Sequence, residues 1–235
     1  QTKICWIIIR VILNFTKMKY LLLDVSGTIL HKPIFFKKIA TVLHDFGFEV
    51  GIEKLKYNHK LLSETIKFPD RTDNSFYDYF NSEYLFSLGI VPNKIILETI
   101  FKTCSYLPWE KYEDTNVLNN LDIPIGILSN FNSSLEEKLN NYFGPIFKDI
   151  FVSETIGISK PSLDFYQYAI DKIGVLPSEI IYVGDSFKLD FQPATNLGIT
   201  TFVIDRDGFY PKNEKIIKSL NDLEGKLHLW KHLQF

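Results

Sequence analysis

The hydrophobic residues of this chain follow two different spacings in two regions. Between about residues 33 and 104, apolar side chains recur every three or four positions, which places them along one face of a helix. In residues 20–30, and again after about residue 105, short continuous apolar runs end at turn residues. Such runs are typical of buried strands in a parallel sheet. The pattern therefore predicts an α/β fold, a doubly wound parallel sheet with a helical insertion.

Four helices are predicted in the insertion, at residues 36–46, 52–66, 75–88 and 93–103. Gly47 and Gly89 follow the first and third of these segments, as expected where a helix ends. The third helix is crowded with aromatic side chains, which we interpret as packing residues of a core. Because no strand interrupts the four helices, residues 33–104 are expected to form a small helical module after the first strand.

After about residue 105, the chain is predicted to alternate between strands and helices. Strands are expected at 123–128, 150–152, 180–183 and 200–204, and helices near 116–121 and at 134–142, 163–173, 189–197 and 216–227. Repeated alternation of strand and helix favours a parallel, doubly wound sheet. Residues 18–32 and 105–235 are therefore expected to form the α/β core around the insertion.

The first seventeen residues stand apart from this pattern. Residues 4–15 are apolar except for Arg10 and Asn14, but the run is shorter than the roughly 20 residues that span a membrane. Met18 stands just before the first strand. We interpret residues 1–17 as an N-terminal extension without a role in function; a weak signal anchor is the alternative.

Charge and cysteine content narrow the choice of partners. The formal net charge is −2 and the isoelectric point about 6.2, so no attraction to nucleic acid or to an anionic membrane is expected. Cys5 and Cys104 form neither a metal-binding spacing nor a disulfide framework. A reducing, cytoplasmic location is the simpler interpretation, and we expect neither nucleic acid nor a membrane as a partner.

Three predicted strands end in polar residues, namely Asp24, Ser129 and Asp185. A fourth polar residue, Lys160, lies in a loop that leads into a helix. The carboxyl ends of parallel strands share one edge of the sheet, where ligands bind in α/β folds, so these side chains can converge. Asp24 could act as a nucleophile, while a hydroxyl and an ammonium could hold the oxygens of the transferred group. Asp185, together with Asp190, could bind a hard cation such as Mg²⁺.

Four short motifs in the sequence are similar to those of a known family. Asp24-Val25-Ser26-Gly27-Thr28, Leu128-Ser129-Asn130, Lys160-Pro161 and Gly184-Asp185-Ser186 with Asp190 occur in this order. They resemble the four motifs of the haloacid dehalogenase-like hydrolase superfamily over roughly residues 19–227. The helical insertion after the first motif is similar to the small cap of the dehalogenase and phosphoglycolate-phosphatase branch. The resemblance implies a Rossmann-like core with a small helical cap.

The resemblance also implies roles for individual residues. Asp24 would be the nucleophile that forms an aspartyl intermediate with a small phosphorylated metabolite. Ser129 and Lys160 would hold the phosphoryl oxygens, with Thr28 and Asn130 as supporting residues.

A magnesium site is implied by the same motifs. Asp24, the backbone carbonyl of Ser26, Asp185 and Asp190 would be the metal ligands, with Asp190 as a direct ligand or as a support. The resemblance thus predicts a magnesium-dependent phosphatase.

Ser26 is the departure from the family pattern, because phosphatases of the family have an aspartate here that works as acid and base. A serine hydroxyl has no protonation step near neutral pH, and such catalysis is typically worth about 10²–10⁴ in rate. Three outcomes are open. The substrate has a good leaving group such as an acyl phosphate, the leaving group is halide or carbon, or the protein binds phosphorylated ligands and hydrolyses them poorly.

Two alternative functions follow from Ser26. A metal-free 2-haloacid dehalogenase needs no acid, but it also has no need of the Asp185 and Asp190 pattern. A phosphonatase would need a lysine of the cap, and we interpret the available lysines as the solvated face of a helix; they are Lys54, Lys56, Lys60 and Lys67.

Overall fold

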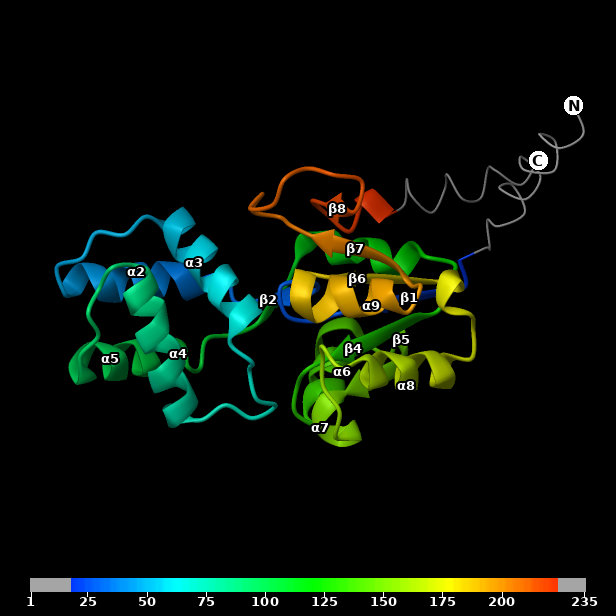
Figure 1. The fold of residues 1–235 in the computed structure, drawn as a ribbon, viewed down its shortest axis with the longest axis horizontal. Helices are drawn as coiled ribbons and strands as arrows, with labels where there is room; N and C mark the ends of the chain where they lie inside the picture. The colour runs from blue at the N-terminus through cyan, green and yellow to red at the C-terminus, as the bar shows by residue number, and fades with distance from the viewer. Residues whose placement is uncertain (1–17, 224–235) are drawn as a thin grey trace, which may run out of the picture.

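The computed structural model describes residues 18–223, so the expectation for residues 1–17 lies outside the described residues. A sheet flanked by helices lies on one side, and a group of helices lies beside it (Figure 1). Within residues 18–223, no helix combines the length and the apolar character needed to cross a membrane.

The sheet has six strands in the order β5-β4-β1-β6-β7-β8, and every neighbouring pair is parallel. The strands are β1 (Tyr20–Leu23), β4 (Ile125–Ser129), β5 (Phe147–Val152), β6 (Ile180–Gly184), β7 (Thr200–Ile204) and β8 (Ile216–Ile217). The predicted parallel α/β sheet is confirmed. Since β1 lies between β4 and β6, three strand ends stand side by side at its carboxyl edge.

Alternate residues of β1 supply the two hydrophobic layers of the core. Leu21 and Leu23 pack in a cluster with residues of the 3₁₀ helix η1 (Glu113–Asn120) and of α6 (Leu135–Phe143). Tyr20 and Leu22 pack on the opposite face with α8 (Leu163–Ile173) and α9 (Gln192–Asn196). Helices therefore cover both faces of the sheet, as expected for a doubly wound fold.

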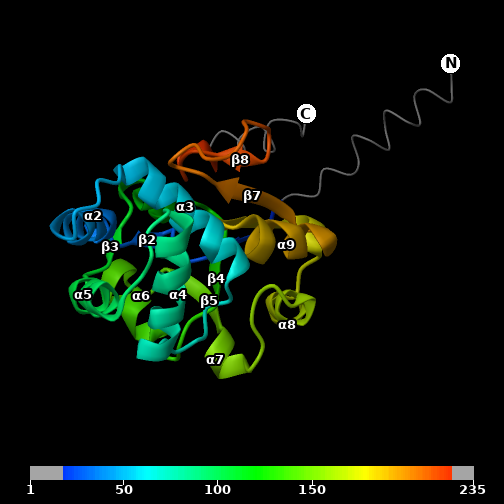
Figure 2. The same ribbon diagram turned by 60° about the vertical axis from the view of Figure 1, so that its left-hand side comes forward.

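The insertion consists of four helices, and their existence and order match the prediction. They are α2 (Phe35–Asp45), α3 (Ile52–Thr65), α4 (Asn74–Ser87) and α5 (Lys94–Cys104). Their apolar faces form a separate core in which Leu43, Leu55, Tyr84 and Ile100 are fully or almost fully buried. Figure 1 shows these helices as a distinct group beside the sheet, in blue to green, and Figure 2 shows the same group turned toward the viewer. The predicted bounds of insertion and core stay a prediction.

A short antiparallel pair of strands joins the sheet and the insertion. It was not predicted, because the sequence suggested only a loop here. Strand β2 (Leu30–His31) pairs with β3 (Glu110–Lys111), so the chain enters and leaves the insertion side by side. The ring of His31 stacks on Tyr112 with 3.9 Å between centroids, and the Arg206 guanidinium lies 3.7 Å from the centre of the Tyr112 ring.

The predicted helix at 216–227 is wrong for residues 216–221, whereas Asp222 and Leu223 are helical. Ile216 and Ile217 form β8, which pairs with Val203 and Ile204 at the edge of the sheet. Their branched side chains suit a strand, and the exposed edge of β7 supplies the backbone hydrogen bonds. The part of the prediction beyond residue 223 lies outside the described residues.

Candidate active site

Asp24 stands at the carboxyl end of β1, between the ends of β4 and β6. Its backbone N–H donates to the carbonyl of Val183 at 2.9 Å, which continues the ladder to β6. The chain then turns at Gly27, whose φ of +77° is disfavoured for other residues. Only 5% of Asp24 is exposed, so its carboxylate is buried at the edge of the sheet.

Lys160 is the counter-ion of this carboxylate. Its Nζ lies 2.6 Å from Asp24 Oδ1 and 2.7 Å from Asp190 Oδ1, and only 3% of the residue is exposed. Tyr182 donates its hydroxyl to the same Asp190 oxygen at 2.7 Å. Sequence reasoning missed Tyr182; the one signal was a polar hydroxyl within an otherwise apolar strand.

The other residues predicted to bind substrate lie around Asp24 and Lys160. The hydroxyls of Ser129 and Thr28 donate to the two oxygens of Asp24 over 3.4 Å each, which makes both hydrogen bonds long. Asn130 holds the Lys160 backbone instead, accepting from its N–H at 2.7 Å and donating to its carbonyl at 3.0 Å. The structure thus brings all five of these residues together.

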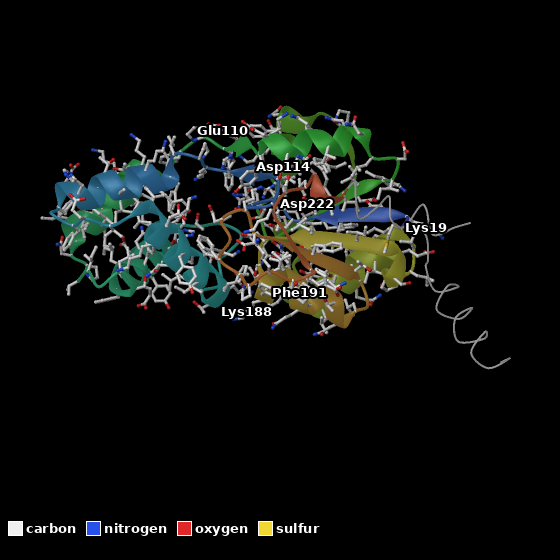
Figure 3. The ribbon with its side chains drawn as sticks, turned by 90° about the horizontal axis from the view of Figure 1, so that it is seen from above. Lys19, Glu110, Asp114, Lys188, Phe191 and Asp222 are labelled. Carbon is white, nitrogen blue, oxygen red and sulfur yellow. The ribbon has the colours of Figure 1, made fainter. Side chains whose placement is uncertain are left out.

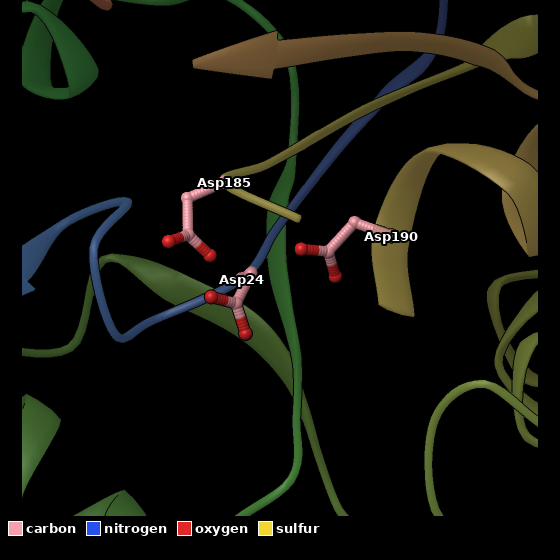
Figure 4. Close-up of side chains that lie close together, drawn as sticks. All are labelled: Asp24, Asp185 and Asp190. Carbon is pink, nitrogen blue, oxygen red and sulfur yellow. The ribbon is translucent and has the colours of Figure 1, made fainter. Parts of the chain in front are cut away.

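Three carboxylates form a cluster that could hold a cation. One oxygen each of Asp24, Asp185 and Asp190 lies within 4.8 Å of the others, and the carboxylates face a common centre in Figure 4. Two glycines leave room for them: a Cβ at Gly27 would lie 2.5 Å from Asp185 Oδ2, and a Cβ at Gly184 would overlap Asp190. An all-oxygen donor set of this kind suits Mg²⁺.

Burial disfavours the ionised form of two of these acids. It raises the pKa of Asp24 to about 6, although the Lys160 ammonium acts in the opposite direction. Burial also raises the pKa of Asp185, against the effect of the Lys60 ammonium. Crowded, buried carboxylates favour a cation that would share their charge, so the donor set fits a divalent metal.

Ser26 takes no part in this network. Its side chain is exposed, and among the hydrogen bonds of the described residues none involves the Ser26 hydroxyl. The residue that departs from the family motif therefore lies beside the cluster without contacting it.

Two residues of the insertion, both on α3, reach the cluster and were missed. Lys60 Nζ lies 2.7 Å from Asp185 Oδ2 and 3.5 Å from Glu64 Oε1, and its side chain is 15% exposed. The prediction of a solvated lysine face is wrong for Lys60. Lys56 is partly exposed and pairs with Asp207 at 2.6 Å. The available signal was the spacing of residues 56, 60 and 64, which places them on one face of a helix.

Glu64 anchors α3 to the loop after β6. Its carboxylate accepts from Ser186 Oγ at 2.7 Å, from the backbone N–H groups of Phe187 and Lys188 at 3.2 and 3.0 Å, and from Tyr210 Oη at 3.3 Å. Lys188 is labelled beside the end of α3 in Figure 3. Asp185 lies in this loop, and Asp190 lies in the short π-helix η3 (Phe187–Phe191) that follows it. The insertion therefore contacts the segment that holds two of the three clustered acids.

A second contact between insertion and core lies near Lys160. Arg71 pairs with Glu154, and Asp70 accepts a hydrogen bond from Ser153. Beside it is a pocket of about 290 Å³ whose lining includes Ser159, the neighbour of Lys160. The other lining residues of this pocket belong to the segment after α3 and are Lys67, Phe68, Pro69 and Asp70.

Comparison with known proteins identifies similar sequences. The family model described as haloacid dehalogenase-like hydrolase matches residues 18–198. The chain is 40% identical to glyceraldehyde 3-phosphate phosphatase of Methanocaldococcus jannaschii over 57 residues, 24% of this chain and 25% of that protein. It is 28% identical to haloacid dehalogenase-like hydrolase domain-containing protein 3 of Danio rerio over 135 residues, 53% of this chain and 55% of that protein.

These matches span about a quarter to just over half of the length of the curated relatives. Among solved structures, the HAD-hydrolase YfnB of Bacillus subtilis bound to magnesium is similar in fold. Its TM-score is 0.64 at 21% identity, covering 91% of this chain and all of that one.

Proposed function

We propose that this chain, which belongs to the haloacid dehalogenase-like hydrolase family, is a magnesium-dependent phosphatase that acts on a small phosphorylated metabolite through Asp24. The observation that carries the proposal is the buried Asp24 carboxylate, held by Lys160 beside Asp185 and Asp190. The phosphatase name of the Methanocaldococcus jannaschii relative supports the same class of reaction.

In this mechanism Asp24 is the nucleophile. Its Oδ2, the oxygen that Lys160 does not contact, attacks the phosphorus atom. The bond to the leaving oxygen breaks, and an aspartyl phosphate forms that water hydrolyses. Lys160 orients the carboxylate through its Oδ1 and supplies positive charge beside the phosphoryl oxygens, as Ser129 does with its hydroxyl. Asn130 keeps the Lys160 backbone in place on both of its polar sides.

Asp24, Asp185 and Asp190, with the carbonyl of Ser26, would hold the Mg²⁺ ion. When bound, the metal neutralises carboxylate charge and polarises the phosphoryl group. The magnesium-bound structure of YfnB, which reveals interdomain movement in that protein, supports this assignment. A similar movement here would separate Lys60 and Glu64 from the core and admit substrate.

The test is a panel of phosphorylated metabolites assayed with Mg²⁺ and with a chelator. We expect Asp24→Asn and chelation each to lower turnover by at least about 10³-fold, because each removes a group that the reaction needs. Asp45→Asn, which changes an exposed aspartate at the end of α2, is the matched control and should retain full activity.

Other results would contradict the proposal and identify an alternative. Turnover that survives Asp24→Asn would exclude Asp24 as nucleophile. Halide release that is insensitive to the chelator would identify a dehalogenase. Phosphate binding without turnover, with activity appearing only in Ser26→Asp, would identify a ligand-binding member of the family that has lost catalysis.

A further inference from the structure

We propose that Lys60, a residue of the helical insertion, stabilises the negative charge that develops on the leaving oxygen of the substrate, the task left open by Ser26. This inference rests on the proposed function. It assigns to the insertion a catalytic residue that contacts the substrate, and it widens the substrate class to phosphate monoesters with basic leaving groups.

The location of Lys60 is the first support. In the described part of the chain, Lys160 and Lys60 are the two cations hydrogen-bonded to an acid of the cluster. Lys160 is engaged by Asp24 and Asp190 within the core. Lys60 contacts Asp185 from the insertion, so the two ammonium groups reach the cluster from different parts of the chain.

The attack geometry gives the second support. In-line attack places the nucleophile about 3–3.5 Å from phosphorus, with the leaving oxygen one bond farther on the opposite side. Asp185 contributes an oxygen within 4.8 Å of Asp24, and Lys60 Nζ lies 2.7 Å from Asp185 Oδ2. An ammonium at this range can donate to a leaving oxygen that lies between the nucleophile and α3.

The charge balance is the third support. Four carboxylates meet at the site, those of Asp24, Asp185, Asp190 and Glu64, against the ammonium groups of Lys160 and Lys60. The excess of two negative charges equals the charge of one Mg²⁺ ion. A divalent cation held by Asp185 would share the charge of that carboxylate, which would leave the Lys60 ammonium available to donate a hydrogen bond to substrate.

Glu64 keeps Lys60 in place for this role. It lies one turn farther along α3, and its carboxylate is fixed by Ser186 Oγ and by two backbone N–H groups of the core. The position of Lys60 is therefore set by a rigid helix with an anchored neighbour rather than by a mobile loop.

The step balances without a proton from Lys60. An oxygen of Asp24 forms its bond to phosphorus while the P–O bond to the leaving group breaks and leaves its electron pair on the oxygen. The Lys60 ammonium donates a hydrogen bond to that anion, which takes a proton from water after it departs. Hence a permanently charged group replaces the acid that the family places at position 26.

The experiment compares two leaving groups in the full chain with Mg²⁺. p-Nitrophenyl phosphate releases a weakly basic anion that needs little help, whereas phenyl phosphate releases a more basic one. We expect Lys60→Met to lower kcat about 100-fold for phenyl phosphate and less than about 5-fold for p-nitrophenyl phosphate. Lys60→Arg, which keeps the charge, should recover part of the phenyl phosphate activity.

Lys56→Met is the matched control. Lys56 lies one turn earlier on α3 and pairs with Asp207 across the same boundary, but it does not contact the clustered acids. Its replacement should lower both activities by the same small factor. Calorimetric titration with orthovanadate supplies a readout besides turnover: we expect about tenfold weaker binding in Lys60→Met and unchanged binding in Lys56→Met.

Three results overturn the inference. Equal losses for both substrates in Lys60→Met, with unchanged vanadate affinity, would make Lys60 a structural contact while leaving the phosphatase proposal intact. A Lys60→Arg variant that behaves like Lys60→Met would likewise exclude a role for the charge of Lys60. Absence of any turnover that depends on Asp24 would overturn the proposed function and the role of Lys60 together.

Discussion

The core half and the insertion half of the site are stabilised in different ways. In the core half, Asp24, Lys160 and Asp190 are each at least 95% buried. Asp24 follows β1, Lys160 lies in a loop, and Asp190 lies in the short helix η3 after β6. In the insertion half, Lys60 and Glu64 are more exposed, and they reach the core only through side-chain contacts. The core half is therefore preorganised by the fold, whereas the insertion half is assembled when the two parts meet.

Lys160→Met should have the largest effect, because it leaves two carboxylates buried without their counter-ion. Losing one partner of a buried ion pair typically costs about 3–5 kcal/mol, which lowers the Tm of a chain of this size by about 10 °C. Thermal unfolding measures the loss, and added Mg²⁺ should recover part of it. Lys19→Met is the control, since Lys19 pairs with Glu179 from an exposed position and should cost less than about 1 kcal/mol. Similar losses in the two variants would mean that the buried position of Lys160 contributes no extra stability to the core.

Glu64→Gln should have an intermediate effect that is confined to the boundary between the two parts. The amide cannot accept hydrogen bonds at both ends as the carboxylate does. At least one of the hydrogen bonds donated by Ser186, Phe187 and Lys188 is therefore lost. We expect a loss of about 1–2 kcal/mol and roughly tenfold faster amide exchange at Phe187 and Lys188, with unchanged exchange in β1.

Glu98→Gln is the control for that experiment, because Glu98 forms an exposed pair with Lys94 within α5. It should change stability by less than about 0.5 kcal/mol. Faster exchange throughout β1 in Glu64→Gln would mean that the anchor stabilises the whole fold rather than its boundary.

His59→Phe should have the smallest effect, and only at acidic pH. Burial lowers the pKa of His59 to about 4, and the Lys60 ammonium adds to the shift. The folded state therefore binds fewer protons than the unfolded state, so stability is lost as pH falls from about 6.5 towards 4. Between pH 6.5 and 5.5 the wild-type chain should lose about 1 kcal/mol more than His59→Phe, as measured by chemical unfolding at both pH values.

The environment of His59 explains why phenylalanine is a suitable replacement. Its ring makes edge contacts with Phe35, Phe36, Phe80 and Tyr84 inside the insertion. An identical pH response in the two proteins would show that the acid sensitivity comes from the core acids instead.

The sequence was most informative where the backbone alone determines position. Asp24, Ser129 and Asp185 could be placed together because each follows a strand of a parallel sheet. Lys60, Glu64 and Tyr182 could not, since their contacts depend on how separate segments pack. The segment around Ile216 was misassigned because its apolar residues fit a helix until the edge of β7 offers hydrogen-bond partners.

The exposed side chain of Ser26 has a consequence for how this protein can evolve. No other described residue depends on its hydroxyl, so a neutral replacement there should change the free energy of unfolding by only about 0.5 kcal/mol. Yet the same position adjoins the nucleophile, where an acid would be worth orders of magnitude in rate. A substitution at this position can therefore change the range of substrates without changing the stability of the fold. Natural selection for a folded protein would exert almost no restraint on such a substitution.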